Sequence, residues 1–335
     1  MEFPAKLDLA QTPTPLQPLD RLSALGGGPR IWIKRDDLTG AIEGGNKIRK
    51  LEYILAKAIS EGYDTVITCG GIQSNHCRAT AALTARLGLS CHLILRGDQP
   101  QQADSNNLLD QILGASIDYY PAKQYFSELT QLFDSTVEDY KLAGKRAYCI
   151  PTGASDGVGL WGYIEASREL KADFSHHGIT PEHIICATGS GGTQAGLTLG
   201  AKLFDLKAKI WGVNVCDDEQ YFYNKVIEDI ADWKQRYNSD LSIDSITPRT
   251  LDGYVGAGYG LAGNEVIDLI NQLARLEGIV LDPVYTGKAF YGMLEELKQG
   301  RFTGSKDIVF IHTGGALGLF PYKDRLQASA SSSVN

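Results

Sequence analysis

Lys47 is a residue whose type and position could serve covalent chemistry. It follows Gly44-Gly45-Asn46 directly and lies where the helical pattern KIRKLEYILAKAISEG begins. An amine at such a turn could be an ordinary solvated cation, or it could form an imine bond with a carbonyl cofactor. The choice between these two roles depends on whether the rest of the chain provides a cofactor site.

A glycine-rich stretch predicts where such a cofactor could place a phosphate. The apolar run HIICA leads into GSGGT, residues 189–193, and a helical pattern follows. Glycines let backbone N–H groups approach an anion, and the N-terminus of a helix favours negative charge. A tight turn without a ligand is the alternative. Gln194 stands where the dinucleotide fingerprint requires glycine, and the Gly-Lys-Ser/Thr ending of a P-loop is missing, so the loop fits neither nucleotide pattern.

Three further strand-like runs end in small and polar residues. They lead into GGIQSNHCR (70–78), PTGASDGVG (151–159) and TGGALGLF (313–320). For each loop alone, ordinary turn chemistry is a sufficient explanation. Because the carboxyl ends of parallel strands meet at one edge of a sheet, all four loops are together expected to form one site.

The elements that must position these loops alternate between strand-like and helical patterns. Helical patterns over 47–62 and 75–88 carry apolar residues on one face, with Ser74 or Asn75 as N-cap of the second. This alternation predicts an α/β fold with mostly parallel sheets covered by helices on both faces. The tail at 328–335 is small and polar, and is predicted to be disordered. Strands are predicted at 31–34, 65–69, 91–95, 146–150, 183–187, 209–213 and 307–311.

The bulk properties restrict the function classes. The 335 residues are 43% hydrophobic and 21% charged, as in soluble globular proteins with two domains or one large one. A net charge of -8 argues against nucleic acid or an anionic membrane as the main partner. The six cysteines lack zinc-site spacing, so no metal site is expected, and several lie in apolar runs, which suggests buried thiols in a reducing compartment. Without a signal-peptide layout or a long apolar run, a cytoplasmic protein is expected.

Six motifs, taken in order, resemble one known family. They are GGNKIRKLE, IQSNHCRATAA, GSGGTQAGL, GYGLAG, LDPVYTGKAF and FIHTGGALGLF, from about residue 8 to about residue 322. The resemblance is to pyridoxal-phosphate enzymes of the tryptophan-synthase-β type (fold type II), in the subgroup of D-cysteine desulfhydrase and 1-aminocyclopropane-1-carboxylate (ACC) deaminase. It implies a large cofactor-binding domain of residues 1–49 plus 159–335 and a small domain of residues 50–158. It also implies pyridoxal phosphate in the cleft between them, and a homodimer.

The resemblance assigns roles by position. Lys47 matches the lysine that forms a Schiff base with pyridoxal phosphate, the electron sink. Ser74 matches a residue near the substrate carboxylate, and Asn75 matches the one that hydrogen-bonds the cofactor's ring oxygen. Tyr259 and Tyr285 match two tyrosines at the substrate; without the resemblance, packing with satisfied hydroxyls would explain both. The phosphate cradle matches Ser190, Gly191, Gly192 and Thr193.

Three residues bear on the choice of substrate or nucleophile. The resemblance implies that Thr286 takes the position facing the pyridine nitrogen, where ACC deaminases carry glutamate. A carboxylate would keep that nitrogen protonated, whereas a hydroxyl shares a neutral hydrogen bond, so Thr286 favours β-elimination over opening of a cyclopropane ring. Asp156 stands where related desulfhydrases carry an uncharged residue; facing the substrate, it would repel a second anionic group or attract an amine. Cys77 is expected in the core rather than as a nucleophile.

These observations predict a lyase for a small amino acid with a leaving group at Cβ. The favoured substrate is D-cysteine, giving pyruvate, hydrogen sulfide and ammonia, with Lys47 removing the Cα proton and Tyr285 as its partner. A lyase of the same fold for L-cysteate, D-serine or another β-substituted amino acid is the nearest alternative. An ACC deaminase, a silent binding protein and a nicotinamide-dependent oxidoreductase are more distant; the intact residue set argues against the binding protein, and Gln194 against the oxidoreductase.

Overall fold

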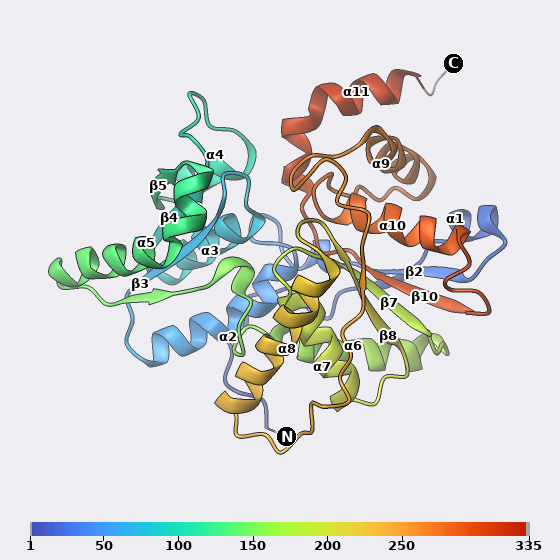
Figure 1. The fold of residues 1–335 in the computed structure, drawn as a ribbon, viewed down its shortest axis with the longest axis horizontal. Coiled ribbons are helices and arrows are strands. Elements are labelled where there is room, and N and C mark those ends of the chain that lie inside the picture. The colour runs from blue at the N-terminus through green and yellow to red at the C-terminus, as the bar shows by residue number, and fades with distance from the viewer. Residues whose placement is uncertain (1, 333–335) are drawn as a thin grey trace.

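The computed structural model describes residues 2–332 and contains two sheets that lie side by side (Figure 1). The larger has the strand order β1-β2-β10-β7-β8-β9, and the smaller has the order β5-β4-β3-β6. All neighbouring strands are parallel except β1 and β2, so the predicted α/β class is confirmed. The strands are β1 Leu16–Pro18, β2 Arg30–Lys34, β3 Thr65–Gly71, β4 Ser90–Arg96, β5 Ser116–Tyr120, β6 Ala147–Cys149, β7 His183–Thr188, β8 Lys209–Asn214, β9 Thr250–Leu251 and β10 Asp307–Ile311.

Helices surround both sheets. The α-helices are α1 Asp20–Gly26, α2 Asn46–Ser60, α3 Asn75–Leu87, α4 Ser105–Ile112, α5 Ala122–Leu142, α6 Trp161–His177, α7 Gly192–Leu203, α8 Glu219–Arg236, α9 Asn264–Glu277, α10 Thr286–Lys298 and α11 Lys323–Ser332. Three short 3₁₀ helices are η1 Asp36–Leu38, η2 Thr152–Ala154 and η3 Ala316–Tyr322.

All seven predicted strands are present, and the three that the sequence did not indicate lie at sheet edges. These are β1, β5 and β9. Strand β9 has two residues, β1 ends in a proline, and the side chains of β5 are half-buried or exposed. These edge strands are short or partly exposed, so they need few apolar residues. Their sequences therefore lack the apolar run that marks a central strand.

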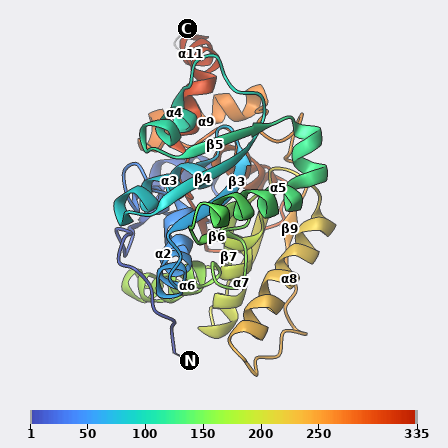
Figure 2. The same cartoon turned by 90° about the vertical axis from the view of Figure 1, so that its left-hand side faces the viewer.

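The two sheets occupy different parts of the chain. Every strand of the smaller sheet lies between residues 65 and 149, and every strand of the larger lies outside that range. Figure 2 shows the smaller sheet with α3 and α5 beside it. Leu93 and Leu95 of β4 pack against α3, while Ile94 packs against α5, because alternate side chains of a strand point to opposite faces. The expected boundaries after residues 49 and 158 suit this arrangement and stay a prediction.

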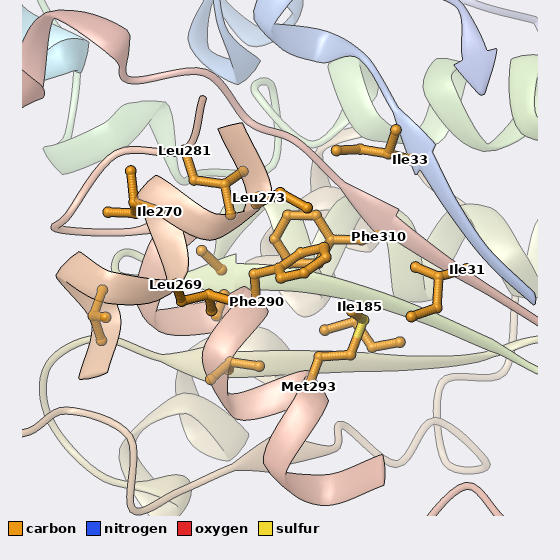
Figure 3. Packing of buried hydrophobic residues seen from close by; sticks show 14 of the residues in the cluster. Ile31, Ile33, Ile185, Leu269, Ile270, Leu273, Leu281, Phe290, Met293 and Phe310 are labelled. Carbon is orange, nitrogen blue, oxygen red and sulfur yellow. The ribbon is translucent and has the colours of Figure 1, made fainter. Parts of the chain in front are cut away.

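The core of the larger unit lies between its sheet and helices α9 and α10 (Figure 3). Phe290 of α10 meets Phe310 of β10 edge to face, with ring centroids 4.9 Å apart. Ile31 and Ile185 belong to the same cluster. Burial of such side chains contributes about 1.5–3 kcal/mol each. This packing fixes the start of α10 near the carboxyl ends of β7 and β10.

Helix α2 connects the two units. It contacts α6 on the side of the larger sheet and α3 on the side of the smaller one. Its apolar face has the spacing that the sequence predicted, and Gly62, with φ +75°, follows its end. The fully buried residues of that face are Ile48, Leu51, Ile54, Leu55 and Ala58.

A buried ion pair anchors the first turn of α2. The Arg49 guanidinium donates to Asp36 Oδ1 over 2.8 Å and to Glu169 Oε2 over 2.9 Å. The Tyr163 hydroxyl donates to Asp36 Oδ2 over 2.6 Å. Burial by itself raises the pKa of Asp36, but the Arg49 charge and these hydrogen bonds outweigh it and leave the pKa lowered. The network holds the start of α2 against η1 and α6.

The C-terminal tail differs from its prediction. Helix α11 continues to Ser332, so the prediction of disorder is wrong for residues 328–332. The reason is a tertiary contact: Arg275 of α9 donates to the Ala330 carbonyl over 2.6 Å, which satisfies a backbone acceptor near the helix end. Residues 333–335 lie outside the described residues.

The expectation about cysteines is confirmed for four of the six. All six are free thiols. Cys149 is exposed and Cys216 is half-buried, so the prediction of buried thiols is wrong for these two. Within residues 2–332, none of the helices combines the length and apolarity needed to cross a membrane. The buried cysteines are Cys69, Cys77, Cys91 and Cys186.

A Gly162→Ala variant should be destabilised, because α6 and α2 touch there through their backbones. A Cβ on Gly162 would lie 2.5 Å from the Arg49 carbonyl carbon. We expect overpacking to lower the free energy of unfolding by about 1–3 kcal/mol, measured by urea denaturation. Gly28→Ala is the control, since a Cβ there meets nothing within 4 Å. Equal stability of the two variants would contradict the close contact.

Candidate active site

A cavity of about 500 Å³ lies where the carboxyl ends of β3, β7 and β10 converge. This volume suits a small ligand. Residues from all four predicted loops line it, so the prediction that they form one site is confirmed. Gly192 and Thr286 are the two predicted site residues that do not line it. Those that do are Lys47, Ser74, Asn75, Ser190, Gly191, Thr193, Tyr259 and Tyr285.

Lys47 reaches the cavity from the N-terminus of α2. The turn before it needs glycine, because Gly45 has φ +111° and a Cβ there would lie 2.8 Å from the Thr313 carbonyl oxygen. The Asn46 N–H donates to that same oxygen over 3.0 Å. The Lys47 ammonium donates to Asn46 Oδ1 over 3.0 Å. The helix start and the loop after β10 therefore fix the lysine together.

The environment favours the neutral, nucleophilic form of the Lys47 amine. Burial lowers the pKa of Lys47 to about 8, and the nearby positive charge of Arg78 adds to this effect, while Asp282 opposes it. An unperturbed lysine has a pKa near 10.4. A larger share of Lys47 is therefore free to attack a carbonyl or to accept a proton near neutral pH.

The 189–193 loop forms an anion cradle at the N-terminus of α7. Gly191 has φ +84°, and a Cβ on Gly192 would lie 2.5 Å from Ser155 Oγ, so neither position accepts a side chain without strain. The Ser155 hydroxyl donates to Ser190 Oγ over 2.9 Å and accepts from the Gly192 N–H over 3.1 Å. Asn46 Nδ2 donates to Thr193 Oγ1 over 2.9 Å. The loop thus presents hydroxyls and a helix N-terminus to one ligand group.

Gln194 has a structural role beneath this cradle. Its side chain is fully buried, and Nε2 donates to the Arg249 carbonyl over 2.8 Å. A Cβ on Gly212 would lie 2.1 Å from Gln194 Oε1, so this glycine of β8 makes room for the glutamine. Gln194, which replaces the glycine of the dinucleotide fingerprint, therefore packs α7 against β8 and the segment before β9.

Lys50 is a cation beside the cradle that the sequence analysis did not identify. It is fully buried, and its ammonium donates to the Gly153 carbonyl over 3.1 Å. A Cβ on Gly192 would lie 2.8 Å from Lys50 Nζ, so the two groups are neighbours. Burial, and then repulsion by Lys47, lower the pKa of Lys50 well below its usual value. The i, i+3 spacing from Lys47 on one helix face was the available signal.

The N-terminus of α3 faces the cavity with Ser74 and Asn75. Of the two predicted N-cap candidates, Ser74 is the N-cap, and its Oγ accepts from the Cys77 N–H over 3.2 Å. Asn75 Oδ1 accepts from Asn106 over 3.2 Å and from Arg78 over 3.3 Å. The Asn75 acceptor is thus used within the protein, which leaves its amide N–H groups as donors for a ligand.

Tyr259 and Tyr285 meet in the cavity through their hydroxyl groups, which share a short hydrogen bond. Their rings are perpendicular, with centroids 5.9 Å apart. Burial raises the pKa of both phenols, and for Tyr285 the neighbouring Tyr259 adds to the rise. Both are therefore protonated at neutral pH, and one of the pair has a proton to donate to a ligand.

Arg96 is a second residue that the sequence analysis missed, and it lines the cavity. Its guanidinium lies over the rings of Phe126, Tyr259 and Tyr125, at 4.8, 5.3 and 5.8 Å from their centroids. The described part of the chain gives it no carboxylate within ion-pair distance. Arg96 thus brings a cation, stacked on aromatic rings, to the cavity wall.

Two residues that the sequence related to the substrate or the cofactor lie outside the cavity lining. Asp156 does not line the cavity; its Oδ1 accepts from the N–H groups of Val158 at 3.1 Å and Gly159 at 2.7 Å, so it closes a turn. Thr286 is fully buried behind the wall, where its Oγ1 donates to Asp282 Oδ1 over 2.7 Å. That Thr286 faces a ring nitrogen stays a prediction. Cys77 is fully buried, and burial raises the pKa of its thiol, as expected for a core residue.

The sequence is similar to proteins of one enzyme family. The family model described as "Pyridoxal-phosphate dependent enzyme" matches residues 7–314. The bifunctional D-cysteine desulfhydrase/1-aminocyclopropane-1-carboxylate deaminase, mitochondrial, of Arabidopsis thaliana is 39% identical over 327 residues, which cover 95% of this chain and 80% of that protein. The D-cysteine desulfhydrase of Klebsiella pneumoniae is 38% identical over 330 residues, with 97% and 98% coverage. A putative 1-aminocyclopropane-1-carboxylate deaminase of Thermotoga maritima is 40% identical over 322 residues, with 96% and 99% coverage.

Solved structures share the fold. An ACC deaminase homologue superposes with a TM-score of 0.88 at 37% identity, covering 97% of this chain and 96% of that one. A fungal L-serine ammonia-lyase from Rhizomucor miehei superposes with a TM-score of 0.70 at 16% identity, covering 96% and 99%. At that low identity the second likeness shows the fold alone.

The cavity residues fit pyridoxal phosphate. Lys47 offers an amine of lowered pKa, and Gly191 and Gly192 leave the backbone of the 189–193 cradle without side chains. Thr188 supplies a further sign of a ligand, because its buried Oγ1 on the cavity wall has no partner within the described residues. In this arrangement the cradle and Lys50 would hold the phosphate, Asn75 the ring oxygen, and Lys47 the aldehyde carbon.

The lowered pKa of Lys47 predicts how the cofactor-free protein reacts with pyridoxal phosphate. Neutral amine is the nucleophile, so the rate of covalent attachment should rise with pH to a midpoint near 8 and then level off. Burial contributes most to this midpoint; the charge of Arg78 lowers the pKa of Lys47 further, and that of Asp282 raises it. Absorbance of the bound cofactor follows the reaction, and a lysine-containing peptide corrects for titration of the cofactor itself. A rate that keeps rising above pH 9, or attachment to Lys47→Ala, would contradict the account.

Proposed function

The chain belongs to the pyridoxal-phosphate-dependent enzyme family, and we propose that it catalyses β-elimination from D-cysteine. D-cysteine and water give pyruvate, hydrogen sulfide and ammonia. The observation that carries the proposal is the pairing of a base, Lys47, with the protonated Tyr259–Tyr285 pair in one cavity. Relatives named D-cysteine desulfhydrase, at 37–38% identity over nearly the whole chain, support it.

The protein's groups divide into those that hold ligands and those that move protons. When bound, pyridoxal phosphate supplies an electron sink for negative charge at the substrate Cα. Ser74 and the N-terminus of α3 can bind the substrate carboxylate, because backbone N–H groups and the helix dipole favour an anion there. Aromatic rings, among them Tyr125 and Phe126, also line the cavity and offer apolar surface to a bound substrate.

The protein takes up one proton, from the substrate Cα, and gives up another, to the leaving sulfur. The free Lys47 amine, with its pKa near 8, takes the proton from the substrate Cα. The leaving sulfur needs a proton to depart as hydrogen sulfide, and Tyr285 can give it, because its phenol is protonated and is hydrogen-bonded to Tyr259. Tyr259 can then return a proton to Tyr285 through their shared hydrogen bond.

The hydrogen bonds of Thr286 weaken the argument that this residue favours β-elimination over ACC deamination. Asp282 Oδ1 also accepts from the Thr286 N–H over 2.8 Å, so this oxygen is an acceptor and the Thr286 hydroxyl proton points to it. A ring nitrogen that met Thr286 Oγ1 would therefore find only a lone pair, which suits a protonated nitrogen. ACC belongs in the same assay for this reason, and also because a relative is named for that activity.

Purified holo-protein should release pyruvate rapidly from D-cysteine and release little from L-cysteine. Lys47→Ala should lower this rate by about 10²–10⁴-fold, because the Cα proton loses its base. A coupled lactate dehydrogenase assay measures pyruvate, and a 2-oxobutanoate assay with ACC runs in parallel. If the protein forms 2-oxobutanoate from ACC but no pyruvate from D-cysteine, it is an ACC deaminase and the proposed desulfhydrase activity is wrong.

Arg96 favours a second candidate, elimination from an amino acid with an anionic β-substituent such as L-cysteate. The guanidinium on the wall could bind the sulfonate, since the described part of the protein gives Arg96 no carboxylate partner. In that case Arg96→Gln should lower kcat/KM for L-cysteate by about 10–100-fold, from the loss of about 1.5–3 kcal/mol of charged hydrogen bonding. The value for D-cysteine should stay within about threefold. No sulfite release from L-cysteate by the wild-type protein would exclude this candidate.

A further inference from the structure

Lys288 is a buried cation whose presence packing does not explain. It lies on α10 with 1% of its surface exposed and does not line the cavity. Among residues 2–332 no carboxylate lies within ion-pair distance of its ammonium; its acceptors are the carbonyls of Val255 at 2.6 Å and Gly258 at 2.8 Å. Burying an ammonium without a counter-ion is energetically unfavourable, and a methionine of similar size would avoid that cost. The hydrogen bonds to this loop are what the lysine provides.

The loop that Lys288 holds carries Tyr259 between glycines. Gly256, Gly258 and Gly260 have φ values of +67°, +141° and +75°, which other residues rarely adopt. Glycines lose more conformational entropy on ordering than any other residue, so this segment gains little rigidity from its own sequence. Its position must therefore be fixed from outside the loop.

Both carbonyls that flank Tyr259 are held by distant side chains. Lys288 of α10 binds the Gly258 carbonyl on one side, and the Tyr322 hydroxyl of η3 binds the Gly260 carbonyl on the other. Arg325 donates to the carbonyl of Ala262, further along the same loop, over 2.8 Å. The first two hydrogen bonds hold the residues immediately before and after Tyr259, whereas the third holds a residue three positions further along.

The same lysine connects the two tyrosines. Tyr285 immediately precedes α10, and Lys288 lies in the first turn of that helix. Lys288 thus connects α10, which follows Tyr285, to Gly258, which precedes Tyr259. The hydrogen bond between the two phenols completes a closed ring of contacts. A shift of the Tyr259 loop against α10 would open that hydrogen bond.

We propose that Lys288 is a positioning residue that holds the Tyr259 loop against α10, so that the Tyr259 and Tyr285 hydroxyls meet at the substrate. This inference rests on the proposed function, in which the pair protonates the leaving group. Lys288 acts through Tyr259 and does not itself touch the substrate. Its removal should therefore affect turnover only while the Tyr259 hydroxyl is present.

Two measurements on the full-length holo-protein test this inference. The first is amide hydrogen exchange measured by mass spectrometry. In Lys288→Met the amides of residues 253–263 should exchange roughly tenfold faster, while the exchange rates of the β7 amides should not change. The second is a double-mutant cycle with D-cysteine. Lys288→Met should lower kcat about tenfold or more with KM within about threefold, and should have no further effect in a Tyr259→Phe background.

Arg325→Met is the matched control. It removes a hydrogen bond to the same loop, but this bond goes to Ala262, which is not adjacent to Tyr259. It should leave kcat unchanged. If Lys288→Met does not fold, Tyr322→Phe replaces it, since this variant frees the other flanking carbonyl by loss of one hydroxyl. Unchanged exchange of residues 253–263, or an equal loss of kcat with and without the Tyr259 hydroxyl, would overturn the inference. A wild-type protein that is inactive on D-cysteine refutes the proposed function, and hydrogen exchange then still decides whether Lys288 holds the loop.

Discussion

The close approach of the Gly45 backbone to the Thr313 carbonyl determines where Lys47 lies. Only glycine fits at this contact, where a Cβ would be 2.8 Å from the carbonyl oxygen. The same oxygen receives the Asn46 N–H, so the first turn of α2 begins against the loop that follows β10. Arg49 and the contact at Gly162 then hold α2 against η1 and α6. A lysine on a flexible stem thus starts from a backbone position that is fixed on three sides.

Buried cationic groups in and beside the cavity would favour an anionic ligand. Burial lowers the pKa of Lys47 to about 8 and that of Arg78 to about 10, and it also lowers the pKa of Lys50. A lowered pKa of a cationic group means that its protonated form is destabilised in the folded protein. A phosphate in the cradle and a carboxylate at the N-terminus of α3 would each relieve that cost. The groups that make Lys47 a better nucleophile therefore also favour the binding of an anionic cofactor and an amino-acid substrate.

The parts of the site that could be predicted from the sequence are those that local patterns define. The apolar runs give the central strands, and glycine, serine and threonine after them give the loops; the N-cap Ser74 needs only the residues that follow it. The residues that were missed depend on distant partners. Arg96 meets Phe126 and Lys288 meets Gly258, and no local pattern indicates these pairs. For Lys50, the spacing from Lys47 indicates the helix face but not the partner, Gly153. The tail at 328–332 was misjudged for the same reason, since its helix end contacts Arg275 of α9. The sequence left open whether Asp156 faces the substrate, and its hydrogen bond to the Gly159 N–H turns it elsewhere.

The most direct test of this account is to locate the cofactor on the chain. Purified protein is reduced with borohydride, which makes an imine bond to lysine permanent, and is then digested and analysed by mass spectrometry. The account predicts a phosphopyridoxyl group on Lys47 and on no other lysine. Lys50 is the internal comparison, because it lies one helical turn away, is fully buried and also has a lowered pKa. A modified Lys50, or a reduced protein without any modified lysine, would contradict the assignment of Lys47 as the reactive amine.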